Sequence, residues 1–195
     1  MDNYIDKVKK FNKKIDYTRD INTARLVLEY CIPLVKSKKI FFVGTGLGGD
    51  SKIVKNIRDF EIIGIEPRET FQEHATKQYN KIGAKLYKKN LGDFVKIFKK
   101  LSGIIFFIHS INHISKNQIL AFEKITKKSY IIIINPNPQI ERVVGKTDNT
   151  VISYLNSKQI QKLLNAEIIF NFFYNSVKIK NENIFLREII VLKKN

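Results

Sequence analysis

The sequence Lys39-Ile-Phe-Phe-Val-Gly-Thr-Gly-Leu-Gly-Gly-Asp50 joins a short apolar run to a cluster of glycines. The run from Lys39 to Val43 is short and bulky, which is typical of a strand buried on both faces of a parallel sheet. The glycines then allow the positive φ angles of a tight turn and a close approach of the backbone to a ligand. From Ser51 to Asp59 the spacing predicts a helix, whose N-terminal end would carry positive charge. This unit predicts a nucleotide-like ligand.

The alternation of strands and helices continues along the chain. Further strands are predicted at 61–65, 85–87, 103–108 and 130–134, with helices at 69–82, 94–100 and 116–126. Five such units predict a doubly wound sheet with right-handed crossovers. A helix at 157–164 then leads to long strands at 167–173 and 184–192, whose direct connection predicts antiparallel pairing. The expected fold class is α/β, a doubly wound, mostly parallel seven-stranded sheet with helices on both faces, an antiparallel strand near one edge and N-terminal helices.

The length of 195 residues suits one domain with one sizeable core, and no repeat, linker or composition break divides it. Within residues 1–195 we interpret 1–37 as a segment of two helices and 38–138 as the cofactor-binding half. Residues 139–195 would form the sheet edge and the substrate side. The single cysteine, Cys31, lies in an apolar run on a predicted helix, which favours a buried structural thiol.

The net charge of +17 by itself suggests nucleic acid or an anionic membrane as a partner. Only six of the 35 basic residues are arginines, whose bidentate fork suits phosphate, and lysine is spread over nearly every segment. This indicates a general composition bias, so nucleic acid is the less favoured partner. No apolar stretch approaches the roughly 20 residues of a membrane span, and the charged start lacks a secretory signal. We expect a cytoplasmic protein without a membrane partner.

Two acidic residues follow predicted strands. Glu66 ends the second strand, about twenty positions beyond the glycines, where a carboxylate can accept hydrogen bonds from both hydroxyls of a ribose. Asp93 lies just past the third strand, where it could meet an adenine amino group. Either acid could instead cap a helix, and Asp93 precedes one.

The segment His109-Ser-Ile-Asn-His-Ile114 follows the fourth strand, beside the crevice expected at the carboxyl edge of the sheet. His113 is the candidate general base, because a near-neutral pKa suits removal of a proton from a hydroxyl or amine. His109 or Ser110 could face the cofactor. The alternative is that the histidine only fixes its loop by hydrogen bonds.

These segments resemble the class I S-adenosylmethionine-dependent methyltransferases over roughly residues 39–138. Phe42-Val-Gly-Thr-Gly-Leu-Gly48 is similar to the glycine motif of that family, Gly64-Ile-Glu-Pro67 to its acidic strand end, Gly92-Asp-Phe94 to its adenine-side motif, and the segment from His109 to the one after its fourth strand. The resemblance implies a cofactor site made of Gly44, Thr45, Gly46, Gly48, Glu66, Pro67, Asp93, Phe94, His109 and Ser110. Phe42 stands where the family often has an acid, so a contact to the methionine part is missing or supplied elsewhere.

The function expected from this resemblance is methyl transfer from S-adenosylmethionine to an oxygen or nitrogen of a small molecule, with S-adenosylhomocysteine as product. Tyr4, Tyr17 and Asn112 are candidate contacts of the acceptor, together with the loop from Gly145 to Thr150. The alternatives are an RNA methyltransferase with the same cofactor site, a nicotinamide-dependent reductase and a non-catalytic nucleotide-binding protein. No metal site is expected, because no histidine, cysteine and acid cluster has the required spacing.

Overall fold

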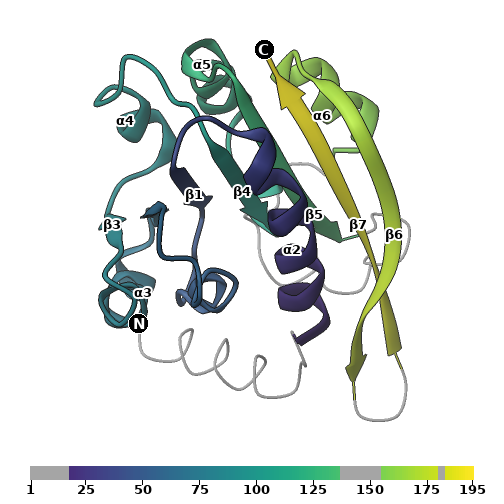
Figure 1. Cartoon of the computed structure of the whole chain (residues 1–195), viewed down its shortest axis with the longest axis horizontal. Helices are drawn as coiled ribbons and strands as arrows, with labels where there is room; N and C mark the ends of the chain where they lie inside the picture. The colour runs from purple at the N-terminus through teal and green to yellow at the C-terminus, as the bar shows by residue number, and fades with distance from the viewer. Residues whose placement is uncertain (1–17, 137–154, 180–182) are drawn as a thin grey trace.

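The computed structural model describes residues 18–136, 155–179 and 183–195, and Figure 1 shows how their helices and strands are arranged. The predicted first helix, Tyr4, Tyr17 and the loop from Gly145 to Thr150 lie outside these residues. The helices are α2 (Thr18–Cys31), α3 (Glu69–Asn80), α4 (Leu91–Val95), α5 (Lys116–Ile125) and α6 (Ser157–Leu164), and the short 3-10 helices are η1 (Ile32–Leu34), η2 (Gly49–Lys52) and η3 (Ile111–His113). The strands are β1 (Lys39–Val43), β2 (Glu61–Ile65), β3 (Lys85–Tyr87), β4 (Ile104–Ile108), β5 (Ser129–Pro136), β6 (Glu167–Ile179) and β7 (Asn183–Lys194).

The strands form one seven-stranded sheet in the order β3-β2-β1-β4-β5-β7-β6. The first five strands are parallel, while β7 runs antiparallel to both β5 and β6. The predicted fold class is therefore confirmed. Strand order reverses between β1 and β4, and in such sheets a crevice opens at this point beyond the carboxyl ends of the strands.

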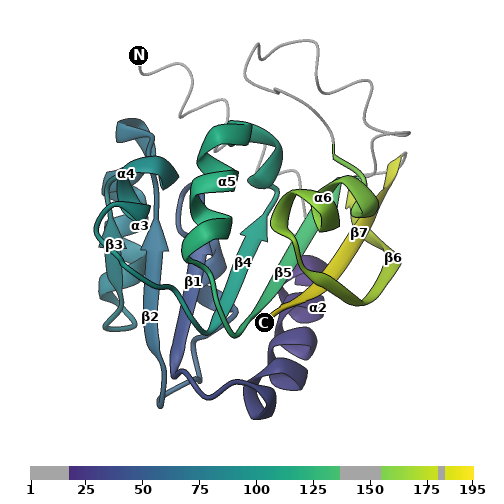
Figure 2. The same cartoon turned by 90° about the horizontal axis from the view of Figure 1, so that it is seen from above.

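Each central strand is buried on both faces, as its unbroken apolar sequence predicted. In β1, Phe41 and Val43 belong to the core on one face, and Ile40 and Phe42 to the core on the other. Helices α4, α5 and α6 cover the first face, and α2 and α3 cover the second (Figure 2). Phe42 stacks on Phe106 with ring centroids 4.9 Å apart, so an apolar pair occupies the position of the family's acid.

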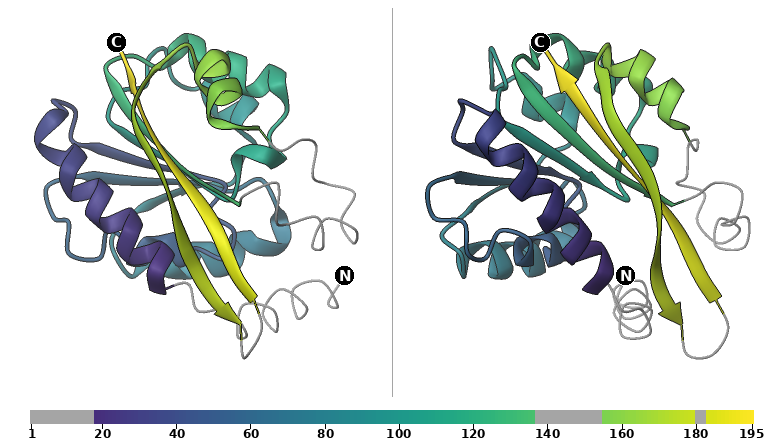
Figure 3. Two further views of the ribbon diagram at one scale, coloured as in Figure 1. Left: turned by 90° about the vertical axis from the view of Figure 1, so that its right-hand side faces the viewer. Right: turned by 45° about the vertical axis from the view of Figure 1, so that its right-hand side comes forward.

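The last two strands are longer than the sequence predicted. β6 continues to Ile179 and β7 begins at Asn183, so the expected connection from Asn175 to Asn183 is mostly strand. Figure 3 shows this hairpin running beside α2, and the rings of Tyr30 and Phe170 meet edge to face at 5.5 Å. Cys31 is fully buried, and burial raises the pKa of its thiol to about 12.

Two predicted helices are wrong in extent. Instead of a helix over 51–59, the chain forms η2 and a series of turns, since the β-branched residues in this short run have low helix propensity. The helix predicted at 94–100 lies at Leu91–Val95, because the Asn90 side chain caps it by accepting a hydrogen bond from the Asp93 amide at 2.8 Å. Among the described residues, no helix combines the length and apolar character that a membrane span requires.

Candidate functional site

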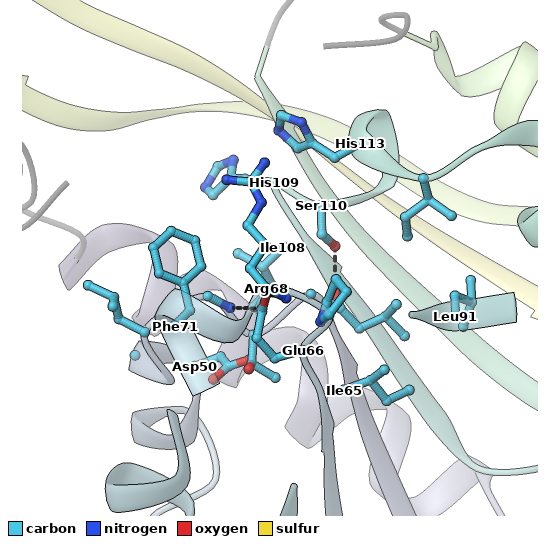
Figure 4. A pocket seen from close by; sticks show the side chains of 18 of the residues that line it. Asp50, Ile65, Glu66, Arg68, Phe71, Leu91, Ile108, His109, Ser110 and His113 are labelled. Atoms are coloured by element: carbon cyan, nitrogen blue, oxygen red, sulfur yellow. Dashed lines mark hydrogen bonds between the residues drawn. The ribbon is translucent and has the colours of Figure 1, made fainter. Parts of the chain in front are cut away.

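A cavity of about 690 Å³ lies at the carboxyl ends of β1, β2 and β4, and we call it the main cavity. Figure 4 shows Asp50 and Glu66 on one side of the cavity and His109, Ser110 and His113, from the segment after β4, on the other. Eight of the predicted site residues line it, namely Gly44, Thr45, Gly46, Glu66, Pro67, His109, Ser110 and His113. The topology therefore brings together three segments that are far apart in the sequence.

Three predicted site residues do not line the main cavity. The Cα of Gly48 is so close to α3 that an added Cβ would lie 3.0 Å from the Cα of Ala75, so this glycine serves packing. Asp93 is exposed, and its carboxylate pairs with Lys96 at 2.8 Å. Phe94 is fully buried in the core against Tyr87. Asn90 and Leu91, just before Asp93, line the cavity in their place.

The glycine turn uses its first and second glycines differently. Both have positive φ, at 75° for Gly44 and 56° for Gly46, a region that other residues rarely adopt. A Cβ on Gly44 would lie 2.6 Å from the Cβ of Ser110, so the segment after β4 needs glycine here in order to pack. A Cβ on Gly46 would meet no atom of the described residues within 4 Å. Gly46 therefore presents bare backbone to open space in the main cavity.

Glu66 is held in place by backbone amides. Its Oε2 accepts a hydrogen bond from the amide of Gly46 at 2.6 Å, and its Oε1 accepts one from the amide of Arg68 at 2.9 Å. The residue is 3% exposed, and burial raises the pKa of the carboxyl although these hydrogen bonds oppose the shift. Each carboxylate oxygen can accept a second hydrogen bond, so Glu66 keeps capacity for a ligand donor.

Asp50, on η2, is a second acid of the main cavity. Its Oδ1 is buried and accepts no hydrogen bond from the described residues. Burial raises the pKa of the carboxyl to about 8, and the neighbouring charge of Glu66 adds to the increase. Hydrogen bonding from the Tyr79 hydroxyl and the Ser51 backbone opposes this increase, but Asp50 still binds a proton up to a much higher pH than an ordinary aspartate.

A third acid, Asp20 on α2, joins distant parts of the chain at the cavity wall. It lies 3.3 Å from Nε2 of His109 and accepts a 2.8 Å hydrogen bond from the hydroxyl of Tyr174 on β6. Burial opposes its charge, but these hydrogen bonds and the positive charge of Arg187 more than offset it and hold the pKa of Asp20 below its usual range. The cavity thus contains a buried carboxylate that stays ionised.

The segment after β4 is fixed from several directions. His109 has a φ of 53°, a strained value for a side chain other than glycine, and its Nδ1 is buried without a partner among the described residues. The Ser110 hydroxyl donates to the carbonyl of Val43 at the end of β1. His113 is exposed and lines the cavity. The segment is thus rigid at His109 and Ser110 and presents His113 at the surface.

Asn112 is buried rather than available to an acceptor. Its Nδ2 donates to Oδ1 of Asn135 on β5 at 3.4 Å, and its Oδ1 accepts from the amide of Leu155 at 3.3 Å. The side-chain Nδ2 of Asn135 in turn donates a hydrogen bond to the backbone carbonyl of Leu155 at 3.5 Å. These contacts tie the end of β5 to the chain that enters α6, which gives Asn112 a positioning role.

Sequence reasoning did not propose several residues of the main cavity. The set includes Asp20, Asp50, Arg68, Phe71, Asn90 and Leu91. Asp50 and Arg68 directly follow predicted motifs in the sequence, and this position could have indicated that they belong to the site. No sequence pattern indicated Asp20, because it lies at the cavity only through the packing of α2. Among the described residues, no group of three or more histidines, cysteines and acids could hold a metal ion.

No family model matches the sequence, and no curated protein is similar to it. Many solved structures nevertheless match the fold. A S-adenosylmethionine-dependent methyltransferase from Clostridium acetobutylicum matches with a TM-score of 0.67 at 12% identity, over 99% of this chain and 98% of that one. A second from Archaeoglobus fulgidus has a TM-score of 0.62 at 16% identity, over 89% and 94%.

The fold is that of the class I methyltransferases. This confirms the resemblance at the level of the fold, which is all that identities this low can show. The same fold also carries other chemistry, since the [4+2]-cyclase SpnF matches with a TM-score of 0.66 at 11% identity, over 89% of this chain and 81% of that one. Function has to be argued from the site.

The raised pKa of Asp50 should make the stability of the protein depend on pH. Between the ordinary aspartate pKa of 3.8 and about 8, the folded protein retains a proton that the unfolded chain has released. Each pH unit in this range therefore lowers the free energy of unfolding by at most about 1.4 kcal/mol. Asp50→Asn cannot ionise, so its stability relative to the native protein should rise steadily from pH 5 to pH 8 in urea denaturation.

The control is Asp93→Asn, because Asp93 is exposed and its pair with Lys96 lowers the pKa of its carboxyl. Asp93 therefore does not titrate between pH 5 and pH 8, and this variant should differ from the native protein by a constant amount. If the stability curves of Asp50→Asn and the native protein are parallel, Asp50 is not protonated in the folded state.

Proposed function

We propose that the protein is a S-adenosylmethionine-dependent methyltransferase that methylates an oxygen or nitrogen of a small molecule. The observation that carries the proposal is the cradle formed by Gly46 and Glu66. At Gly46 a Cβ would meet none of the described residues, and Oε2 of Glu66 accepts a 2.6 Å hydrogen bond from the same backbone amide. A bare backbone beside an acid at the end of the next strand suits the ribose and methionine parts of a nucleoside ligand.

Buried polar atoms without partners also support a ligand in the main cavity. Such atoms usually have a hydrogen-bond partner, since leaving one unpaired costs about 1–3 kcal/mol. Thr45 Oγ1, Asp50 Oδ1 and His109 Nδ1 are all buried without a partner among the described residues, and all three residues line this cavity. A cofactor with hydroxyl and amino groups would satisfy part of this set.

The residues divide the work of holding the cofactor. Glu66 would accept hydrogen bonds from ribose hydroxyls, while Asn90 and Leu91 stand on the β3 side, where the adenine would lie. Asp20 stands on the other side of β1, with His109. As an ionised carboxylate, it would bind the ammonium group of the methionine part. Asp20 would then supply the anionic contact that Phe42 cannot make.

The chemistry needs little from the protein beyond position. The cofactor, when bound, supplies a methyl group already activated by its sulfonium charge. The rigid segment from His109 to Ser110 would fix the wall against which the acceptor is held, and correct placement contributes most of the rate in such transfers. His113, exposed at the cavity, is the residue we propose to accept a proton from the acceptor.

The lack of a full helix after the glycine turn argues against a nicotinamide cofactor. A dinucleotide places its anionic pyrophosphate at the N-terminus of the helix that follows the glycine turn. Here that place is taken by η2, a 3-10 helix of four residues from Gly49 to Lys52. So short an element has little dipole. The main cavity is thus better suited to a ligand without phosphates.

An RNA methyltransferase with the same cofactor site is the second candidate function. It is favoured by one observation, a groove lined by lysines on the far side of η2. The cofactor and its residues would be the same in both cases, and only the acceptor would differ.

Calorimetric titration with S-adenosylmethionine and S-adenosylhomocysteine tests the cofactor, with NADH as the comparison ligand. The native protein should bind the first two and not NADH. Gly46→Ala should lose binding by at least about tenfold, because its methyl group fills the cradle, while the positive φ costs only about 1–2 kcal/mol of stability. Gly44→Ala is the contrasting variant, since its clash with Ser110 should mainly destabilise the fold. Saturable binding of NADH alone would end the methyltransferase proposal.

Asp20→Asn tests the methionine contact separately. Loss of one charge-assisted hydrogen bond should weaken S-adenosylmethionine about tenfold or more, since such bonds contribute about 1.5–3 kcal/mol. Methylthioadenosine lacks the amino-acid part, so its affinity should not change in Asp20→Asn. Glu66→Ala is the matched variant, which should weaken both ligands. Equal losses of both ligands in Asp20→Asn would exclude a specific contact with the ammonium group.

A further inference from the structure

A second hollow of about 670 Å³ lies on the other side of η2, between the chain that follows it and the end of α3. Figure 1 shows α3 beside these turns. We call it the basic groove, and it is lined by Ser51, Lys52, Val54, Lys55, Ile57, Arg58, Phe60, Glu61, Ile62, Gln78, Lys81, Ile82, Gly83 and Lys85. Lys52 lines both this groove and the main cavity.

The positive charges of the basic groove are not balanced by acids among the described residues. Its only carboxylate among the described residues, Glu61, is bound by Lys39 at 3.1 Å and by Lys85 at 2.9 Å. These contacts lower the pKa of Glu61 and use its charge. Four exposed cations of the lining, Lys52, Lys55, Arg58 and Lys81, form no ion pair with any described residue.

The lysine-rich composition alone does not explain this concentration of charge. Among the described residues, two lysine or arginine side chains, Lys52 and Arg68, line the main cavity, which also holds the carboxyl groups of Asp20, Asp50 and Glu66. The main cavity is therefore rich in acids, while the basic groove on the other side of η2 is rich in bases. A bias spread evenly over the sequence would have made the two alike.

The backbone explains how the groove arises. A full helix over 51–59 would have packed on the sheet beside α3, but the chain forms turns there. Val54, Phe60 and Ile62 are buried beneath these turns and form an apolar floor. The lysine stems extend from the walls and keep their ammonium groups in water. Lys52, Lys55 and Arg58 come from one wall, while Lys81 and Lys85 come from the other.

We propose that the basic groove binds the phosphate backbone of a nucleic-acid strand. Several unpaired cations from two separate segments that line one hollow match a polyanion, and lysine binds phosphate as a point charge. The shared chemistry is the phosphate group, which a free polyphosphate would also offer. The inference does not rest on methyl transfer, because binding in the groove is measured without the cofactor.

The test compares two double variants with the same change in charge. The groove variant, Lys55→Glu with Arg58→Glu, reverses two positive charges in the basic groove. The control variant, Lys124→Glu with Lys127→Glu, reverses the charges of two exposed lysines at the end of α5, which covers the opposite face of the sheet. Fluorescence anisotropy with a labelled single-stranded RNA measures affinity across a salt series. The groove variant should bind about tenfold or more weakly, and its salt slope should fall by roughly 1.4, or about 0.7 for each lost phosphate contact. The control should lose less than about threefold, because screening weakens distant charges.

Competition with tripolyphosphate distinguishes the two sources of phosphate. Tight RNA binding that tripolyphosphate displaces only weakly supports the nucleic-acid strand. Tight tripolyphosphate binding that the groove variant loses, without RNA binding, would overturn the strand in favour of a free polyphosphate. Equal losses in both double variants, or no binding by the native protein, would overturn the site. Unchanged thermal melting and unchanged calorimetry with S-adenosylmethionine would show that the groove variant is folded and that its cofactor site is separate.

Discussion

The hydrogen bond between the Gly46 amide and the Glu66 carboxylate is the contact on which the site depends. Burying an acid is costly unless donors surround it, and here two backbone amides do so, from the turn after β1 and from the chain after β2. The carboxylate thus links two neighbouring strand ends and fixes the shape of the glycine turn. Because Gly46 has no side chain, the same contact leaves the cradle open to a ligand.

The sheet was predictable from the sequence because its central strands are buried on both faces and read as unbroken apolar runs. The bounds of the helices were harder to predict from the sequence. The segment 51–59 has helical spacing, but spacing alone cannot show whether the chain has a partner surface that favours a helix over turns. The start of α4 was missed because Asn90 was not recognised as its cap, and the length of the β6–β7 hairpin depends on pairing between the two strands.

The candidate site was predictable where it follows strand ends, since parallel strands carry their carboxyl ends to one edge. Glu66 and His109 follow strand ends and line the main cavity, as predicted. Asp20 could not be found in this way, because it lies 89 residues from His109 and 154 from Tyr174. The hydrogen bonds and charges that lower its pKa exist only when α2, β4, β6 and β7 have assembled around it.

The distribution of charge limits what the fold can bind. A shared fold does not decide the ligand, as the cyclase with the same architecture demonstrates. In this chain, however, the main cavity holds an ionised Asp20 and a buried Glu66, and these acids disfavour an anionic ligand beside them even though Lys52 and Arg68 also line the cavity. S-adenosylmethionine brings a sulfonium and an ammonium group to such a site, whereas a dinucleotide brings a pyrophosphate. The cations that could hold phosphate lie across η2 in the basic groove, so the two proposed sites would keep a cationic ligand and a polyanion apart.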